Sequence, residues 1–191
     1  MLMLYSFDTS TMSDDAFFKM YEECDASRKL KIDRLQKEPS KKLSVAAGML
    51  ARRGIAQHFG IHPKEVSFRR DKNGKPYAEG LDIHFSLSHS GTVAVCAISD
   101  KPVGIDVEKV RDVNMRVAQK MFTPRERYYV FSDKRKMKRR FFEIWTKKEA
   151  YVKRIGTKIW DFQSFDVIGD TSVYLLEDKK YVVAVSVTEH T

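Results

Sequence analysis

The sequence predicts an α+β fold made of two halves of similar size. The first half reads as strands around helical segments, and the second half opens with a strand, continues with helices and closes with strands. A turn-forming run at residues 100–102, Asp-Lys-Pro, lies near the middle of the 191 residues. Because the order of elements is similar in both halves without an exact repeat, we expect two related units, residues 1–101 and 102–191.

The composition is that of a folded and strongly basic protein. Hydrophobic residues make up 42% of the chain, and the formal net charge is +9. This charge favours partners that are negative, such as phosphorylated cofactors, acidic proteins, nucleic acid or anionic membranes. The two cysteines, Cys24 and Cys96, have neither disulfide-framework nor zinc-site spacing, which fits a cytoplasmic setting. No apolar run reaches transmembrane length, and residues 1–7 are expected to form a strand rather than a signal peptide.

Local patterns predict the elements of the first half. We expect a first strand at 1–7, a helix capped by Ser13, a charged helical face at 25–42, a helix at 43–59, and strands at 66–70, 83–87 and 93–98. Asn73-Gly74 predicts a chain reversal. Residues 88–91, Ser-His-Ser-Gly, are expected to form a turn that gathers an imidazole, hydroxyls and backbone N–H groups, a good set for an anion. These residues lack the strand-elbow-helix context of a serine hydrolase.

The second half is predicted in the same way. We expect a strand at 103–108, helices at 114–121, from 124 onward and at 141–153, and strands at 164–168, 172–176 and 181–187. Thr123 and Glu126 have the spacing of a capping box, so Glu126 can be read as a helix cap.

Three acidic side chains stand out in the second half. Asp106 and Glu108 are two residues apart in an expected strand and therefore project to the same side. Like charges held together call for a shared proton or a hard divalent cation, unless the strand simply lies at a solvent edge. Trp145, Glu149 and Lys153 share one helix face, where a surface salt bridge between the last two is the simpler interpretation.

Four stretches together carry a more specific signal. They are residues 73–76 (Asn-Gly-Lys-Pro), 85–91 (Phe-Ser-Leu-Ser-His-Ser-Gly), 103–108 (Val-Gly-Ile-Asp-Val-Glu) and 145–153 (Trp-Thr-Lys-Lys-Glu-Ala-Tyr-Val-Lys). In order and approximate spacing they resemble the 4'-phosphopantetheinyl transferases, specifically the Sfp-like group. The resemblance covers roughly residues 25 to 168.

The resemblance implies a pseudo-twofold fold with the active site in the cleft between the halves. Residues 1–101 would supply the adenine- and phosphate-binding elements, and residues 102–191 the metal-binding and catalytic ones. The implied reaction moves 4'-phosphopantetheine from coenzyme A to a serine of an apo acyl or peptidyl carrier protein, with Mg²⁺, and releases adenosine 3',5'-bisphosphate. The implied enzyme is a cytoplasmic monomer that binds an acidic carrier protein but neither nucleic acid nor membrane.

Matching by position also assigns residues. The implied metal ligands are Asp106, Glu108 and Glu149; the implied catalytic residues are Glu149, Lys153 and Glu126; the implied coenzyme A contacts are Arg28, Lys31, Lys75, Pro76, Ser88, His89 and Lys153. Glu149, Glu126 and a metal-bound water all stay open as the base that deprotonates the serine. The chain departs from the pattern at Leu43, where a phosphate-binding Arg is expected, and Lys41 or Lys42 is the expected replacement for that contact.

Alternatives from other classes are less favoured. The basic run 134–140 could bind nucleic acid, but no aromatic platform, zinc spacing or recognition motif accompanies it. An inactive relative that binds coenzyme A is disfavoured by the three intact acids and Lys153. We expect Met115–Phe131, with apolar Met121, Phe122 and Tyr128, to contribute to carrier docking. The sequence leaves open fatty-acid, polyketide, nonribosomal-peptide and siderophore systems, as well as the use of acyl-coenzyme A.

Overall fold

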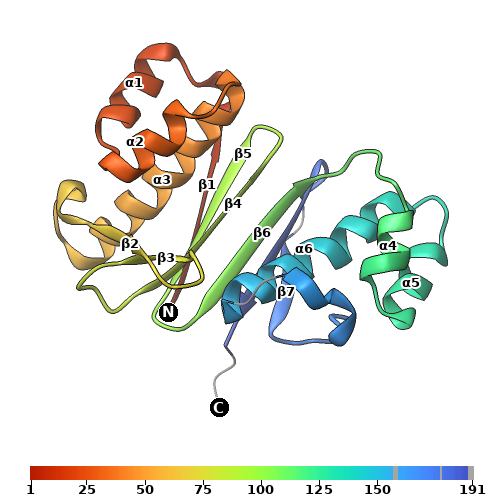
Figure 1. Cartoon of the computed structure of the whole chain (residues 1–191). Coiled ribbons are helices and arrows are strands. Elements are labelled where there is room, and N and C mark those ends of the chain that lie inside the picture. Colours follow the sequence, from red (N-terminus) through yellow and green to blue (C-terminus); the bar gives the residue numbers. More distant parts are fainter. Residues whose placement is uncertain (157–158, 177, 189–191) are drawn as a thin grey trace. The chain divides into compact units, whose positions relative to one another are not determined.

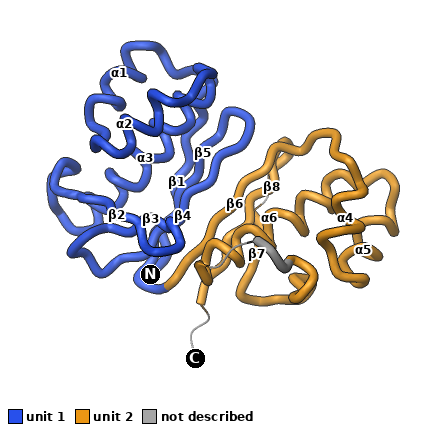
Figure 2. The backbone as a smooth tube through the Cα atoms, viewed as in Figure 1, with its two compact units in different colours: residues 1–101 blue, residues 102–191 orange. Residues whose placement is uncertain are grey.

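The computed structural model describes residues 1–156, 159–176 and 178–188, with the side chains of residues 159–161 also excluded. The chain divides into two compact units, Met1–Lys101 and Pro102–Thr191, which Figure 2 shows in different colours. Each unit has its own sheet and its own hydrophobic clusters. The two units are therefore described separately.

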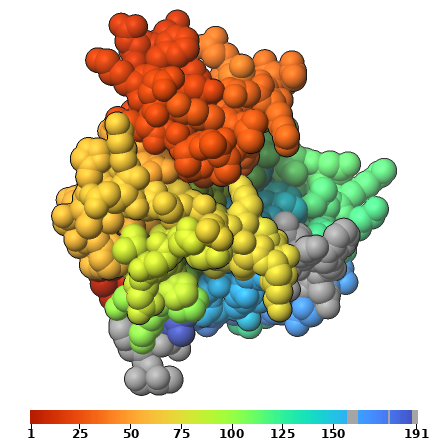
Figure 3. Space-filling model, turned by 60° about the vertical axis from the view of Figure 1, so that its left-hand side comes forward, coloured from red at the N-terminus to blue at the C-terminus, as the bar shows by residue number. Residues whose placement is uncertain are grey.

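The first unit combines a three-stranded antiparallel sheet with three helices and a small hairpin (Figure 1). Its elements are β1 (Leu2–Asp8), η1 (Thr9–Thr11), α1 (Asp14–Glu22), α2 (Ala26–Asp33), α3 (Glu38–Phe59), η2 (Pro63–Glu65), β2 (Phe68–Arg70), β3 (Pro76–Ala78), β4 (His84–Ser90) and β5 (Val93–Ser99). The sheet has the order β1-β5-β4, and β2 pairs with β3. Helices α1 and α2, in red and orange tones, form part of the surface seen in Figure 3.

Helix α3 is the central helix of this unit. Pro39 lies in its first turn, and Gly60 ends it in the left-handed conformation at φ 64°. Ile55 is fully buried against sheet residues such as Ile98, and burying such a side chain stabilises the fold by about 1.5–3 kcal/mol. Gly54 lets the helix approach the sheet, because a Cβ there would lie 2.6 Å from the Ile98 side chain. The helix begins at Glu38, five residues before the expected start.

Strand β4 corrects the expectation of a turn at residues 88–91. The strand runs through Ser88 and His89 to Ser90, which pairs with Val93 of β5. Only Gly91 and Thr92 connect the two strands, and Gly91 has a φ of 61° that suits a glycine. Continued pairing with the apolar strand β5 therefore extends the ladder into the segment that was expected to turn. The other predicted reversal is present, with Gly74 at φ 85° between β2 and β3.

The second unit is an antiparallel sheet covered by a long helix (Figure 1). Its elements are β6 (Val103–Lys109), α4 (Arg116–Met121), α5 (Pro124–Phe131), α6 (Met137–Ile155), η3 (Ile159–Ser164), β7 (Val173–Leu176) and β8 (Tyr181–Val187). The strand order is β6-β8-β7, and α6 packs on these strands. None of the helices in the described ranges is long and apolar enough to cross a membrane.

Gly104 sets the close approach of β6 to α6. A Cβ on Gly104 would lie 1.9 Å from the Ala150 carbonyl oxygen and 2.6 Å from the Arg154 backbone nitrogen. Any other residue at this position would therefore clash with the backbone of α6. The side of β6 that carries Gly104 therefore faces α6. Because side chains alternate along a strand, Asp106 and Glu108 project to that same side.

The prediction of a strand at residues 164–168 is wrong. Residues 159–164 form a 3-10 helix, and the residues that follow are not in a ladder. Their backbone groups have other partners: the Phe165 carbonyl accepts from Lys148, and the Val167 N–H donates to Glu126. A buried pair of charged side chains thus uses the backbone groups that a strand would need.

Candidate functional site

The acidic side of β6 carries two carboxylates, each paired with a cation. Lys153 Nζ lies 2.7 Å from Asp106 Oδ1 and also donates to the Ile105 carbonyl at 3.2 Å. Arg111 Nη1 lies 2.6 Å from Glu108 Oε2. The Asp106 side chain is 7% exposed and that of Glu108 is 20% exposed. This part of the strand is therefore not a solvent-exposed edge, since both acids are largely buried and each is paired with a cation.

Glu149 of α6 lies in the electrostatic field of both acids. Burial, followed by the negative charge of Asp106, raises the pKa of Glu149 to about 7, while Lys153 opposes this shift and Glu108 adds to it. Glu149 and Lys153 are one turn apart on the same side of the helix. The strand and the helix together bring the three acids and Lys153 into one electrostatically coupled group.

This group is not a ready-made metal centre. Residues 1–156, 159–176 and 178–188 contain no group of three or more His, Cys, Asp or Glu side chains gathered so that they could hold a metal ion. Its donor chemistry nevertheless fits Mg²⁺, which prefers carboxylate oxygens and needs few of them. The structure shows the acids as coupled neighbours, two of which bind cationic side chains of the same unit.

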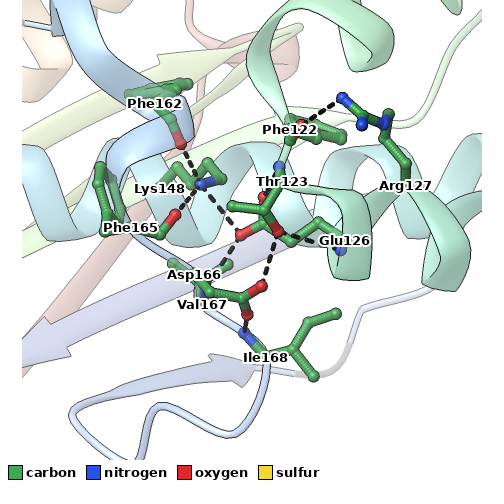
Figure 4. Close-up of polar contacts among 10 residues, drawn as sticks. All are labelled: Phe122, Thr123, Glu126, Arg127, Lys148, Phe162, Phe165, Asp166, Val167 and Ile168. Carbon is green, nitrogen blue, oxygen red and sulfur yellow. Dashed lines mark hydrogen bonds and ion pairs between the residues drawn. The ribbon is translucent and has the colours of Figure 1, made fainter.

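Glu126 lies elsewhere in the second unit, in a closed network (Figure 4). Its side chain is fully buried and lies 3.0 Å from Lys148 Nζ, which is also fully buried. Its oxygens accept from the backbone N–H groups of Thr123 at 2.8 Å and Val167 at 3.0 Å. Thr123 in turn caps α5, so the capping box is formed as expected.

Lys148 is the residue of this network that sequence reasoning missed. It precedes Glu149 in the helix, but it turns to the Phe162 and Phe165 carbonyls and to Glu126. Burial lowers the pKa of Lys148, and the Glu126 charge opposes that shift. Both carboxylate oxygens of Glu126 are bonded inside the unit and its side chain has no exposed surface, which favours a structural role over the role of base that the resemblance implies.

In the first unit, a basic pocket of about 300 Å³ brings together cations from separate elements. It is lined by Asp25, Ser27, Arg28, Lys31, Ala51, Phe68, Arg69, Arg70, Pro76 and Phe85. Three residues expected to contact coenzyme A, namely Arg28, Lys31 and Pro76, are in this lining. Burial lowers the pKa of both Arg28 and Lys31, and for Lys31 the neighbouring Arg28 and Arg70 charges lower it further. Such a concentration of positive charge suits a phosphorylated ligand.

Local packing holds Arg28 at this pocket. Asp25 caps α2 by accepting from the Arg28 backbone N–H at 2.9 Å, and its other oxygen binds buried Arg52 at 3.0 Å. Gly48 of α3 leaves room for the guanidinium, since a Cβ there would lie 3.1 Å from Arg28 Nε. Spacing along the chain does not indicate that Arg69 and Arg70 line this pocket, because they reach it through the tertiary placement of the β2-β3 hairpin.

The other expected contacts of the first unit are not in this lining. Lys75 directly precedes Pro76, and burial lowers its pKa. Ser88 is buried, whereas His89 is exposed. Because they are consecutive residues of β4, their side chains point to opposite faces of the strand rather than converging on one point. Leu43, at the departure noted above, is a buried core residue, and Lys42 binds Asp14 and Glu38.

Comparison with protein families defines the class of protein. Residues 102–187 match the model of the 4'-phosphopantetheinyl transferase superfamily, and residues 11–101 match the model of the N-terminal part of 4'-phosphopantetheinyl transferases. Together the two matches extend over residues 11–187. The chain therefore belongs to the 4'-phosphopantetheinyl transferases, a family of transfer enzymes, as the four motifs indicated.

Individual relatives agree with this assignment. The chain is 38% identical over 114 residues to the 4'-phosphopantetheinyl transferase gsp of Aneurinibacillus migulanus, covering 59% of this chain and 48% of the relative. It is 33% identical over 141 residues to a 4'-phosphopantetheinyl transferase of Bacillus subtilis, covering 72% and 62%. It is 31% identical over 110 residues to the transferase Sfp of Bacillus subtilis strain 168, covering 56% and 49%. The matched part thus spans about half to three fifths of each relative's length.

Proposed function

We propose that this protein transfers 4'-phosphopantetheine from coenzyme A to a serine of an apo carrier protein. The observation that carries the proposal is the coupled group of Asp106, Glu108, Glu149 and Lys153 within a chain of this family. In the reaction the serine oxygen forms a bond to the phosphorus next to pantetheine. The bond from this phosphorus to the bridging oxygen breaks, and adenosine 3',5'-bisphosphate leaves with the electron pair.

The acids of the second unit would hold the cation that this chemistry needs. Asp106, Glu108 and Glu149 are the proposed ligands of Mg²⁺, whose charge would neutralise the pyrophosphate oxygens. Lys153, now bound to Asp106, is proposed to turn its ammonium to the same phosphates. Glu149 is the proposed acceptor of the serine proton, because it is only half-buried whereas Glu126 is fully enclosed.

The basic pocket of the first unit is the proposed site for the nucleotide part of coenzyme A. Arg28, Lys31 and Arg70 concentrate positive charge there, and Pro76, Phe68 and Phe85 offer apolar surface for a base. A pocket of about 300 Å³ lies at the lower end of the size range of small-molecule sites. Lys75, Ser88 and His89 are kept as proposed contacts outside its lining.

The proposed partner is an acidic carrier protein that docks on the segment Met115–Phe131. Tyr128 on α5 is 78% exposed, so it is available for a partner. Phe122 is expected to belong to the same surface, but it is fully buried in the core of the unit. It therefore does not belong to the proposed docking surface. In the basic run 134–140, Lys138, Arg139 and Arg140 bind groups of their own unit. These contacts weaken the case for a nucleic-acid surface.

Intact-mass spectrometry tests the proposal directly. The protein is incubated with coenzyme A, Mg²⁺ and apo forms of an acyl and a peptidyl carrier, and the mass of one phosphopantetheine group should be added. Asp106→Asn should slow the transfer by about 100-fold or more, because it removes a charge from the proposed ligands of the cation that would stabilise the transferred phosphate. Asp112→Asn is the matched control, since Asp112 is 90% exposed and pairs with Lys138. Failure to modify either carrier would contradict the proposal.

A further inference from the structure

Arg111 has no role in the proposed reaction, yet it directly contacts a proposed metal ligand. Its Nη1 atom lies 2.6 Å from Glu108 Oε2 and also donates to the Lys109 carbonyl at 3.1 Å. An ion pair of this length is charge-assisted and neutralises the carboxylate. The side chain of Arg111 is 55% exposed, whereas that of Glu108 is 20% exposed. The cation is therefore the outer, more accessible member of the pair.

The position of Arg111 is built into the fold. The guanidinium lies over the ring of Phe142, 5.1 Å from its centroid, and Phe142 is buried in the core of the second unit. On either side of Arg111, Val110 and Val113 pack against the same core, and the Val110 N–H donates to the Lys180 carbonyl at 2.9 Å. A guanidinium that stacks on an aromatic ring is held in position more firmly than a surface arginine without such a contact.

The same helix face links Arg111 to the proposed site. Phe142, Glu149 and Lys153 follow one another at spacings of seven and four residues, so they lie along one side of α6. Lys153 covers Asp106 toward the carboxyl end of the helix, and Arg111 covers Glu108 toward the amino end. Two cations of the unit thus bind two of the three proposed ligands.

We propose that Arg111 competes with the divalent cation for Glu108, so that the Glu108–Arg111 ion pair must open when the cation binds. This inference rests on the proposed function, because it takes Glu108 as a metal ligand. Arg111 is then a positioning residue that sets the affinity of the site for its cation. A cation that takes Glu108 must displace the guanidinium, whose free energy of pairing is subtracted from that of binding.

Binding of Mn²⁺, measured from the electron paramagnetic resonance signal of the free ion, tests this without an activity assay. Arg111→Gln should lower the Kd for Mn²⁺ by about three- to fivefold, the order expected for a half-exposed ion pair. The matched control is Arg139→Gln, which removes the same charge from an arginine that pairs with Glu143 at 3.3 Å. The control should change the Kd by less than about twofold, since its charge is not on a proposed ligand. In a Glu108→Gln background, Arg111→Gln should have no further effect.

The outcomes separate this inference from the proposed function. An unchanged or raised Kd in Arg111→Gln, or equal tightening in Arg139→Gln, overturns the competition while leaving the transfer reaction to its own assay. A wild-type protein that binds no Mn²⁺ overturns the competition together with the proposed metal ligands. Suppose that carrier modification is lost in Asp106→Asn while the Kd for Mn²⁺ is the same in wild type and Arg111→Gln. The proposed function would then stand, and only the competition would be rejected.

Discussion

Two lysines of α6, five residues apart, form ion pairs of opposite character. Lys148 pairs with Glu126 at 3.0 Å, and both side chains are fully buried. Lys153 pairs with Asp106 at 2.7 Å, with side chains 30% and 7% exposed. The first pair is closed by backbone groups of Thr123 and Val167, whereas the second lies in a group of acids whose charges interact.

The difference shows how one helix can serve both the fold and a site. A buried pair with backbone partners gains from low dielectric surroundings but cannot exchange partners without leaving an unpaired charge. In the second pair Lys153 is partly exposed, so water can replace its partner and the pair costs less to open. We therefore propose that Glu126 and Lys148 serve stability, and that Asp106 and Lys153 serve ligand binding. The first prediction below tests this proposal directly, and two smaller ones test charged groups of the first unit.

The largest effect is expected for the buried pair. Glu126→Ala should lower the free energy of unfolding by about 3–5 kcal/mol, because Lys148 would keep a buried and uncompensated charge. Denaturant unfolding measures the change, and Asp106→Asn is expected to lose less than about 1 kcal/mol. Replacing both partners, Glu126→Leu with Lys148→Met, should recover much of the lost stability. Equal losses in Glu126→Ala and Asp106→Asn would contradict the division between the two pairs.

A smaller effect is expected at the basic pocket of the first unit. Arg28→Gln should raise the KM for coenzyme A by about tenfold and change kcat little, because it removes a charge-assisted contact that substrate and transition state share. Steady-state kinetics of carrier modification measure both constants. Arg53→Gln is the control, since Arg53 is 51% exposed, pairs with Glu23 and does not line the pocket. A fall in kcat at unchanged KM would show that Arg28 acts in the chemical step instead.

The smallest effect concerns the Asp25–Arg52 pair, which is intermediate in burial. Burial by itself would raise the pKa of Asp25, but hydrogen bonds from Arg28 and Ser27 and the charge of Arg52 outweigh it and hold this pKa below its ordinary value. The resulting stability is present above the unfolded pKa of about 3.9 and is lost as pH falls through the lower folded pKa.

Because Asp25 is partly exposed, solvent screening limits this contribution to less than about 1 kcal/mol. Asp25→Asn should therefore be slightly less stable than wild type near pH 7. The difference should narrow as the pH falls below about 4 and through the lower folded pKa, below which both proteins have a neutral side chain. Unfolding curves at several pH values measure this gap. A gap that is constant with pH would mean that capping by the side chain, rather than its charge, provides the stability.

Much of the second unit could be predicted from local pattern. Alternation along a strand placed Asp106 and Glu108 on one side, and helical spacing placed Glu149 and Lys153 on one face of α6. The failures occurred where distant groups replaced the local ones. Residues 164–168 lack a strand because Glu126 and Lys148 bind their backbone groups, and β4 continues through His89 because β5 offers it a full ladder.

The sequence by itself determined the α+β class, the division into two units and the family. It also determined which side of the strand and which face of the helix carry the acids, since these features depend on short-range geometry and on motifs. Only the tertiary structure decided that Glu126 is enclosed, that Arg70 joins Arg28 at a pocket and that Arg111 covers Glu108. Each of these depends on which side chains burial brings together. Which side chains meet depends on packing across the whole unit, and this packing cannot be inferred from the spacing of residues along the chain.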